Sequence, residues 1–278
     1  MANSSTVKII KDASGEERVM IRVDKTLKEM MEEKPSSRWG PDYWNPKYDY
    51  LDQIVSKFEM PSLLTIEGPE VIIAGDHVRP SKGESKGYGL GTKIEYYETA
   101  GFLDVAYDYS RVKECSENAF ARLKDTSVQQ FDILISVAGV GGVGKARSCI
   151  VTNRPAKRSC TGDVFTIRLK KTNPFYFYVF LKSKIGKDQI LRMKNGVGTE
   201  NLNTKEALEL RLPIIPISVQ VSIERKYKQL MEAFNTAMKG KIEDQEAQYK
   251  KNITKAESML RDLISSTEAV IRGERDDI

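Results

Sequence analysis

The last sixty residues of the chain constrain its fold more than any other segment. Between Val219 and Arg272 there is no proline, and Gly240 is the single glycine. Apolar residues recur there at seven-residue intervals, a pattern that predicts a coiled-coil helix and not a helix of a globular core. The first series is Ile223, Leu230 and Ala237, and the second is Ile242, Tyr249, Ala256, Leu263 and Val270, with Ile253 and Leu260 on the same face.

The two heptad series differ in phase by five residues, so a slip or bend is expected near Gly240. At 1.5 Å per residue, about 54 residues of helix would be roughly 80 Å long. An isolated helix with an apolar stripe needs a partner helix to cover it. We therefore predict that residues 219–278 form a spacer and dimerisation helix, with the contact residues Ile223, Leu230, Ile242, Tyr249, Ile253, Leu260 and Leu263.

The preceding part of the chain is typical of short strands separated by turns. Residues 1–25 suggest a hairpin, because apolar residues alternate with polar ones on both sides of Asp12–Gly15. Further strands are expected at 70–74, 93–98, 131–138, 148–152, 164–168 and 212–217, and one helix at 175–183. The predicted class is α+β: an N-terminal extension (1–37), a mostly-β domain with irregular loops (38–218), and the long helix (219–278).

Composition excludes several classes of function. The chain has 278 residues, of which one is a histidine and three are cysteines without a CxxC pair. This excludes a disulfide framework, a Cys/His zinc cluster and a histidine-based triad, and we predict no metal and no cofactor. A membrane-spanning helix needs about 18 consecutive apolar residues, and the sequence contains no such run. The first ten residues do not have the pattern of a signal peptide, so a cytoplasmic location is expected.

Positive charge is concentrated in the middle of the chain. Residues 139–195 contain thirteen lysines and arginines but two acidic residues, Asp163 and Asp188. Residues 1–138, in contrast, carry 18 basic and 23 acidic side chains. A basic block of this size is the electrostatic pattern of a protein that binds nucleic acid. The alternative is a lysine-rich surface that is simply solvated.

A glycine-rich segment, Gly139–Ala146, fits the G-x-x-x-x-G-K core of a phosphate-binding loop. Such a loop needs a hydroxyl after the lysine and a helix behind it, whereas Ala146 follows Lys145 and the next residues favour a strand. A glycine turn that presents Lys145 and Arg147 outward is the competing interpretation. The enzymatic alternatives are a nucleotide hydrolase that uses this loop, or a metal-dependent nuclease that uses Asp76 and Glu84.

Several motifs, taken in order, resemble the specificity subunits of type I restriction-modification systems. Phe131–Gly139 with Gly144-Lys145 is similar to a strand–turn–strand motif of that family, and Leu208–Pro216 to the strand that leads into its long helix. Leu181–Ile190 with Gly196–Asn203, and the aromatic Tyr43–Tyr48, resemble two further passages. The resemblance covers about residues 38–278.

The resemblance implies a non-enzymatic subunit that recognises a double-stranded DNA sequence and directs separate methyltransferase and restriction (translocase) subunits to it. Members carry two recognition domains and two antiparallel helices. One of each is found here, which implies a half-subunit that forms a homodimer through its helix, or a partner of another recognition subunit. The residues we expect to contact DNA are Lys145, Arg147, Arg154, Lys157 and Arg158, together with Lys82, Lys86, Lys93, Lys194 and Asn195.

Overall fold

The computed structural model describes residues 6–11, 17–22, 26–33, 43–74, 85–86, 94–122, 127–139, 141–152, 157–195 and 200–278. The strands form a hairpin and two four-stranded sheets, with the orders β1-β2, β3-β10-β7-β8 and β4-β6-β5-β9. Their bounds are β1 Thr6–Lys11, β2 Glu17–Arg22, β3 Ile72–Ala74, β4 Ser85–Lys86, β5 Ile94–Tyr97, β6 Lys113–Cys115, β7 Ile133–Ser136, β8 Ser148–Ile150, β9 Lys157–Cys160 and β10 Val164–Ile167.

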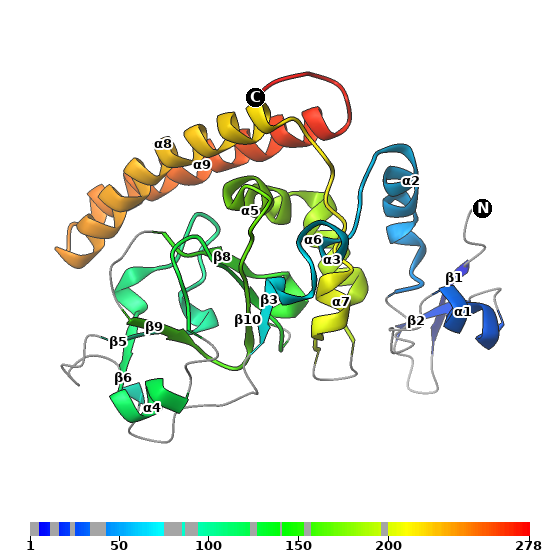
Figure 1. Ribbon diagram of the computed structural model, residues 1–278, viewed down its shortest axis with the longest axis horizontal. Coiled ribbons are helices and arrows are strands. Elements are labelled where there is room, and N and C mark those ends of the chain that lie inside the picture. Colours follow the sequence, from blue (N-terminus) through cyan, green and yellow to red (C-terminus); the bar gives the residue numbers. More distant parts are fainter. Residues whose placement is uncertain are drawn as a thin grey trace.

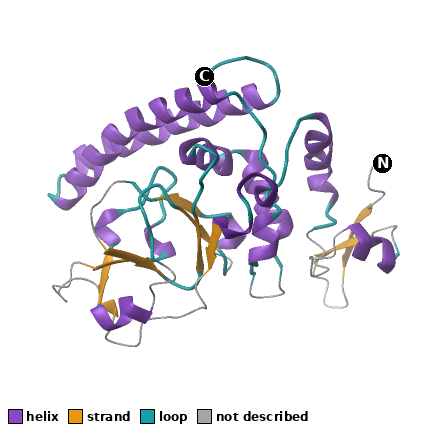
Figure 2. Ribbon diagram, in the orientation of Figure 1, coloured by secondary structure: helices purple, strands orange, loops and turns teal. Residues whose placement is uncertain are grey.

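Helices flank these sheets, so the class is mixed α+β, as predicted (Figure 2). The α-helices are α1 Leu27–Glu33, α2 Asp49–Lys57, α3 Leu63–Glu67, α4 Glu117–Arg122, α5 Pro174–Lys182, α6 Lys184–Met193, α7 Thr204–Leu208, α8 Ile217–Ile242 and α9 Glu246–Ile271. Short 3₁₀ helices include η1 Pro46–Tyr48, η2 Pro69–Val71, η3 Thr99–Gly101, η4 Tyr109–Arg111 and η6 Val143–Lys145.

The sheet β3-β10-β7-β8 is buried on both faces. Ile133 and Ile135 of β7 belong to the main core, which also contains α5, α8 and α9. Leu134, which points the other way, packs in a second core with Cys149 and Cys160, toward the second sheet. Because successive residues of a strand face opposite sides, burial of both faces requires a continuous apolar run, and β7 reads Ile-Leu-Ile.

Helix α5 is the central element, lying between the sheet and the α8–α9 pair (Figure 1). All its residues from Phe175 to Lys182 are buried, which matches a helix that is apolar on every side. Pro174 at its first position and the Asn173 side chain, which accepts the backbone amides of Phe175 and Tyr176, define its start. The predicted helix at 175–183 is thus confirmed.

The prediction of a single C-terminal helix is wrong. Helix α8 ends at Ile242, a turn follows in which Asp244 has φ 57°, and α9 runs back alongside α8 (Figure 1). Each helix has 26 residues, or about 39 Å at 1.5 Å per residue. The expected bend near Gly240 is found three residues later, because each heptad series forms its own helix.

The apolar stripe of each helix is covered within the chain. Ile223 and Leu230 of α8 are fully buried, and Leu260 and Leu263 of α9 are each 3% exposed. Tyr249 and Ile253 are partly buried against the same core, whereas Ile242 is 66% exposed at the end of α8. We expected a homodimer because the apolar stripe of a single long helix would be exposed. Since α8 and α9 cover each other's stripes, that reason no longer holds.

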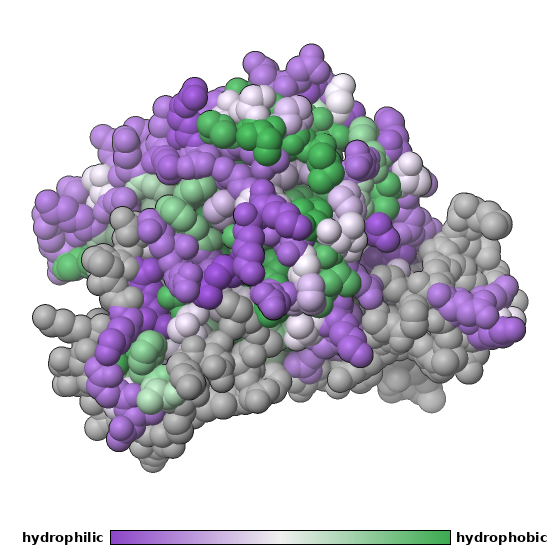
Figure 3. All heavy atoms as spheres, viewed as in Figure 1, coloured by the Kyte–Doolittle hydropathy of each residue, from purple (hydrophilic) through white to green (hydrophobic). Residues whose placement is uncertain are grey.

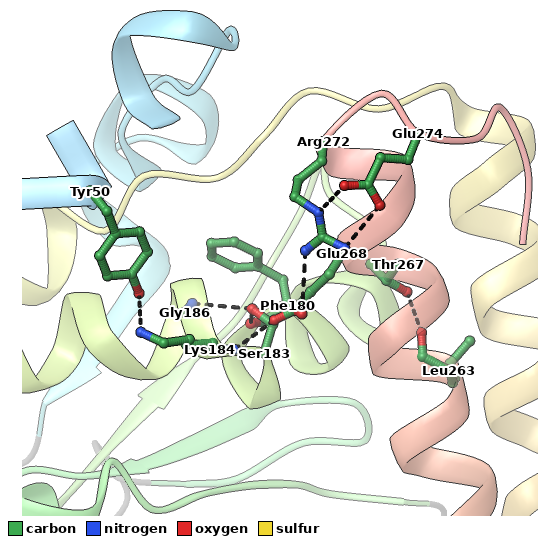
Figure 4. A network of polar contacts seen from close by, with 10 residues as sticks. All are labelled: Tyr50, Phe180, Ser183, Lys184, Gly186, Leu263, Thr267, Glu268, Arg272 and Glu274. Carbon is green, nitrogen blue, oxygen red and sulfur yellow. Dashed lines mark hydrogen bonds and ion pairs between the residues drawn. The ribbon is translucent and has the colours of Figure 1, made fainter. Parts of the chain in front are cut away.

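Polar contacts hold α9 on the α5–α6 junction (Figure 4). The Ser183 hydroxyl accepts the Gly186 amide at the start of α6, and the Glu268 carboxylate from α9 accepts the Lys184 amide at 2.7 Å. Arg272 forms ion pairs with Glu268 at 3.6 Å and with Glu274 at 2.6 Å. The helical pair is thus tied to the rest of the core by capping as well as by apolar packing.

The other sequence predictions divide clearly. The N-terminal hairpin is confirmed, with Val7 opposite Ile21 and Ile9 opposite Val19. Strands β3, β5, β7, β8 and β10 lie within predicted ranges. The elements without a counterpart among those expected are α1, α2, α3, α4, α6, α7, β4, β6 and β9. The predicted strand 212–217 is wrong: its prolines have no N–H to donate, and it pairs only loosely with 59–61 before α8 begins at Ile217.

Among the described residues, no helix is long and apolar enough to cross a membrane.

Candidate nucleic-acid interface

Carboxylates from distant segments neutralise most of the basic block at 139–195. Arg168 forms a bidentate pair with Asp132 (3.0 and 2.7 Å), and Arg192 forms one with Asp52 (2.6 and 2.9 Å). The other pairs are Lys157–Glu117, Arg158–Glu95, Lys170–Glu70, Lys182–Asp104, Lys184–Asp188 and Lys194–Glu200. Six of these eight acids come from the acidic segment 1–138, so the positive block of the sequence is not a continuous positive surface.

Three of the residues expected to contact DNA make polar contacts within the chain. Arg158 is 3% exposed, with its Nε 3.6 Å from the Glu95 carboxylate. Lys194 forms an ion pair with Glu200. Asn195 is buried and donates from its side chain to the Met193 carbonyl at 2.9 Å and to the Glu206 carboxylate. The surroundings of Arg158 and Asn195 leave neither side chain facing outward.

The remaining expected residues are placed as follows. Lys157 is exposed on β9 and lies 3.4 Å from the Glu117 carboxylate. Lys145 is exposed at the end of η6, and Arg147 is half-buried just before β8. The expected contacts outside the described residues are Lys82, Lys93, Arg154 and the side chain of Lys86.

The glycine turn at 139–146 does not have the geometry of a phosphate-binding loop. Its backbone amides donate to its own carbonyls: Gly142 and Gly144 to Gly139, and Lys145 to Gly142. No helix of the required length follows, because Ala146 takes a left-handed conformation (φ 48°) and β8 begins at Ser148. The described residues of the turn therefore do not present a row of amides at the start of a helix, which is the geometry that a nucleotide-binding loop needs.

The glycines instead allow close packing. A Cβ on Gly144 would lie closer than 3.0 Å to the Glu200 carboxylate, and one on Gly142 equally close to the Ser136 hydroxyl and the Ala138 carbonyl. The amide of Gly139 donates to the Glu200 carbonyl at 2.8 Å, so the turn is docked on the segment around residue 200.

Three cations are carried by the elements that meet where β7 and β8 are joined by this turn. We call Lys145, Arg147 and Lys187 the hairpin-end cluster. Helix α6, which carries Lys187, packs against η6, which carries Lys145. None of the three is within ion-pair distance of a described carboxylate; Arg147 Nη2 donates to the Phe102 carbonyl at 2.8 Å.

The pKa of the neighbouring Asp104 carboxyl group is affected by these positive charges. Burial acts to raise the pKa of its carboxyl group, but the charge and the hydrogen bond of Lys182, followed by the charges of Lys187 and Arg147, outweigh that effect and lower the pKa. Lys182 itself is buried, donates to the Ser148 carbonyl at 2.8 Å, and has a pKa lowered by burial. The cluster suits phosphate contacts, which fix the position of a protein on DNA. Lys187 was not singled out by the sequence, because only the packing of α6 on η6 distinguishes it from other lysines of the block.

The described residues give little support to a metal site or to a cysteine nucleophile. They contain no group of three or more His, Cys, Asp or Glu side chains that could hold a metal ion. Burial raises the pKa of the Cys149 and Cys160 thiols to about 12, so neither is a thiolate nucleophile at neutral pH. Asp76 and Glu84 lie outside the described residues.

Comparison with known proteins finds no matching family model and no matching curated protein. The chain is similar to a solved structure from work on the complex assembly and conformational transition of the type I R-M system, with a TM-score of 0.42 and 13% sequence identity. The similarity covers 89% of this chain and 56% of that one, so this chain spans little more than half the length of its neighbour. We therefore base the assignment of function on the chain's own residues.

Proposed function

We propose that this chain is a non-catalytic DNA-recognition subunit of a restriction-modification system, which directs separate methyltransferase and restriction subunits to a target sequence. The observation that carries the proposal is the hairpin-end cluster. Lys145 and Arg147 lie on the strand–turn–strand motif that resembles the family's own, and Lys187 lies on α6, which packs against that turn. None of the three has a carboxylate partner within ion-pair distance among the described residues. Side chains on such a turn would contact phosphates, while loops beside it would read base edges.

The same geometry favours binding over nucleotide hydrolysis. The amides of Gly142, Gly144 and Lys145 already donate within the turn, and no hydroxyl follows Lys145 to hold Mg²⁺, so the turn is poorly suited to a nucleotide's phosphates. Purified protein should therefore lack ATPase activity, and Lys145→Ala should weaken DNA binding only. ATP hydrolysis by the isolated chain that this substitution abolishes would contradict the proposal.

The direct test measures duplex DNA binding by fluorescence anisotropy over a range of salt concentrations. Replacing Lys145 and Lys187 together by alanine should lower the log–log salt slope by roughly two units, one for each lost phosphate contact. The matched control replaces Lys170 and Lys171, which are exposed but lie at the far end of β10. If the two double variants have the same slope, the hairpin-end cluster is not the interface.

Partner subunits would meet the helical pair. The visible surface of α8 and α9 is mostly hydrophilic, but hydrophobic side chains gather near the start of α8 (Figure 3). There Ile214, Ile217 and Val221 are 53%, 68% and 45% exposed. Exposed apolar patches of this kind mark interaction surfaces. Replacing Ile217 and Val221 by serine should reduce co-purification of the methyltransferase subunit without lowering stability; unchanged co-purification would exclude this surface.

A further inference from the structure

A cavity of about 520 Å³ opens between α8 and the end of the β7–β8 hairpin that is opposite the hairpin-end cluster. Its size is typical of small-molecule sites. Its walls come from five separate parts of the chain: η4, the turn before β7, the segment after β8, the start of α5 and one face of α8. The side chains that matter for its chemistry are Tyr109, Gln130, Phe131, Phe175, Met231 and Asn235.

The cavity combines an aromatic floor with an amide rim. Phe175 and Met231 are 3% and 7% exposed, and the ring of Phe131 lies 5.1 Å from that of Phe175, inclined by 58°. At the mouth, Gln130 and Asn235 are both exposed and approach from different elements. A ligand would therefore place its flat apolar surfaces below and its hydrogen-bonding edge above.

The wall of the cavity also contains backbone strain. Phe131 has a φ of 68°, a conformation that is rare for large side chains and often marks a functional position. The turn is nonetheless firmly held: the Phe131 amide donates to the Val151 carbonyl at 2.8 Å. The next residue, Asp132, is buried, accepts the Gln129 amide at 2.7 Å and pairs with Arg168. These contacts hold the turn that places the Phe131 ring at the cavity.

The charge of the cavity favours a neutral ligand. Lys228, the one charged side chain among those of its lining, forms an ion pair with Glu224 one turn away on α8. That pairing leaves no net positive charge directed at a phosphate or carboxylate. The ligand should therefore be recognised by stacking and by neutral hydrogen bonds.

We propose that this cavity binds a nucleobase. A base has two flat faces, which stack on aromatic side chains, and an edge that alternates donors and acceptors. Asn and Gln side chains offer one acceptor and an NH₂ donor in a single plane, and so complement such an edge. The base comes either from a free nucleoside or from an unpaired position of a nucleic-acid strand. Because the cavity and the hairpin-end cluster lie at opposite ends of β7–β8, the proposal does not depend on the proposed function.

The test uses 2-aminopurine, a fluorescent base whose emission falls when it stacks on aromatic rings. One arm titrates the full chain with 2-aminopurine riboside, and the other with a single-stranded oligonucleotide that contains one 2-aminopurine. Two cavity variants are compared with wild type: Gln130→Ala with Asn235→Ala, and Phe131→Gly, which removes the ring but accepts a positive φ without strain. The matched control is Gln129→Ala with Gln229→Ala, two exposed amides that do not line the cavity.

We expect saturable quenching in at least one arm, at least tenfold weaker binding in both cavity variants, and wild-type binding in the control. Circular dichroism verifies that each variant is folded. Quenching by the riboside identifies a free nucleoside as the source, and quenching by the oligonucleotide alone identifies a base within a strand. No quenching in either arm, or equal quenching by the folded cavity variants and wild type, overturns the proposal.

Discussion

Truncation of Leu260 to alanine tests whether the heptad seam is closed within one chain. Leu260 is 3% exposed on α9, in the core that α9 shares with α8. Removing a fully buried leucine side chain typically costs about 2–5 kcal/mol, from lost transfer free energy and the cavity left behind. Ile242 belongs to the same heptad pattern but is 66% exposed, so Ile242→Ala should change the free energy of unfolding by about 0.5 kcal/mol or less.

The assay is urea unfolding followed by far-ultraviolet circular dichroism, at two protein concentrations that differ a hundredfold. If the seam closed between two chains, this increase in concentration would raise the apparent stability by about 2.7 kcal/mol. The hairpin of α8 and α9 predicts no shift of the midpoint. Equal costs for Leu260→Ala and Ile242→Ala, or a midpoint that rises with concentration, would refute the intramolecular seam.

Three further substitutions probe packing and polar contacts elsewhere. Gly186→Ala should cost about 1–3 kcal/mol by thermal melting, because its Cβ would lie closer than 3.0 Å to the backbone of α5, whereas Gly141→Ala, with open space around it, should cost little. Burial acts to raise the pKa of Glu67, but the Thr172 hydroxyl and three backbone amides outweigh it and lower the pKa. Glu67→Gln should therefore lower the free energy of unfolding by about 1.5–3 kcal/mol at pH 7. This difference from wild type should vanish as the pH falls below 4.5, the ordinary glutamate value, and through the lowered pKa of Glu67. A difference that does not change with pH would contradict this. Glu268→Ala should cost about 1 kcal/mol and speed hydrogen exchange at the Lys184 amide, which loses its acceptor; unchanged exchange would show that the contact is dispensable.

Local patterns in the sequence determined the elements whose signal lies within a few residues. The heptads specify helix from Ile217 onward, and Asn173-Pro174 specifies the start of α5. The apolar run of β7 and the alternation of β1 and β2 specify strands in the same way. Short helices such as α3 and α7 were not predicted, because five residues are too few to show a periodic pattern.

Only the tertiary structure decided which side chains are available to a ligand or a partner. A heptad pattern shows that the apolar stripe of a helix must be buried against another helix. Whether that helix belongs to the same chain depends on the three-residue turn at 243–245, which lets α9 run back along α8. Likewise, the linear excess of lysine and arginine is neutralised by acids up to 140 positions away, such as Asp52 beside Arg192. Ion pairs, seams and cavities form between segments distant in sequence, whereas propensity and periodicity are properties of neighbours along the chain. For that reason the sequence draws attention to Lys145 and Arg147, whereas only the folded chain shows that the helix of Lys187 packs against their turn and that Arg158 and Asn195 are buried.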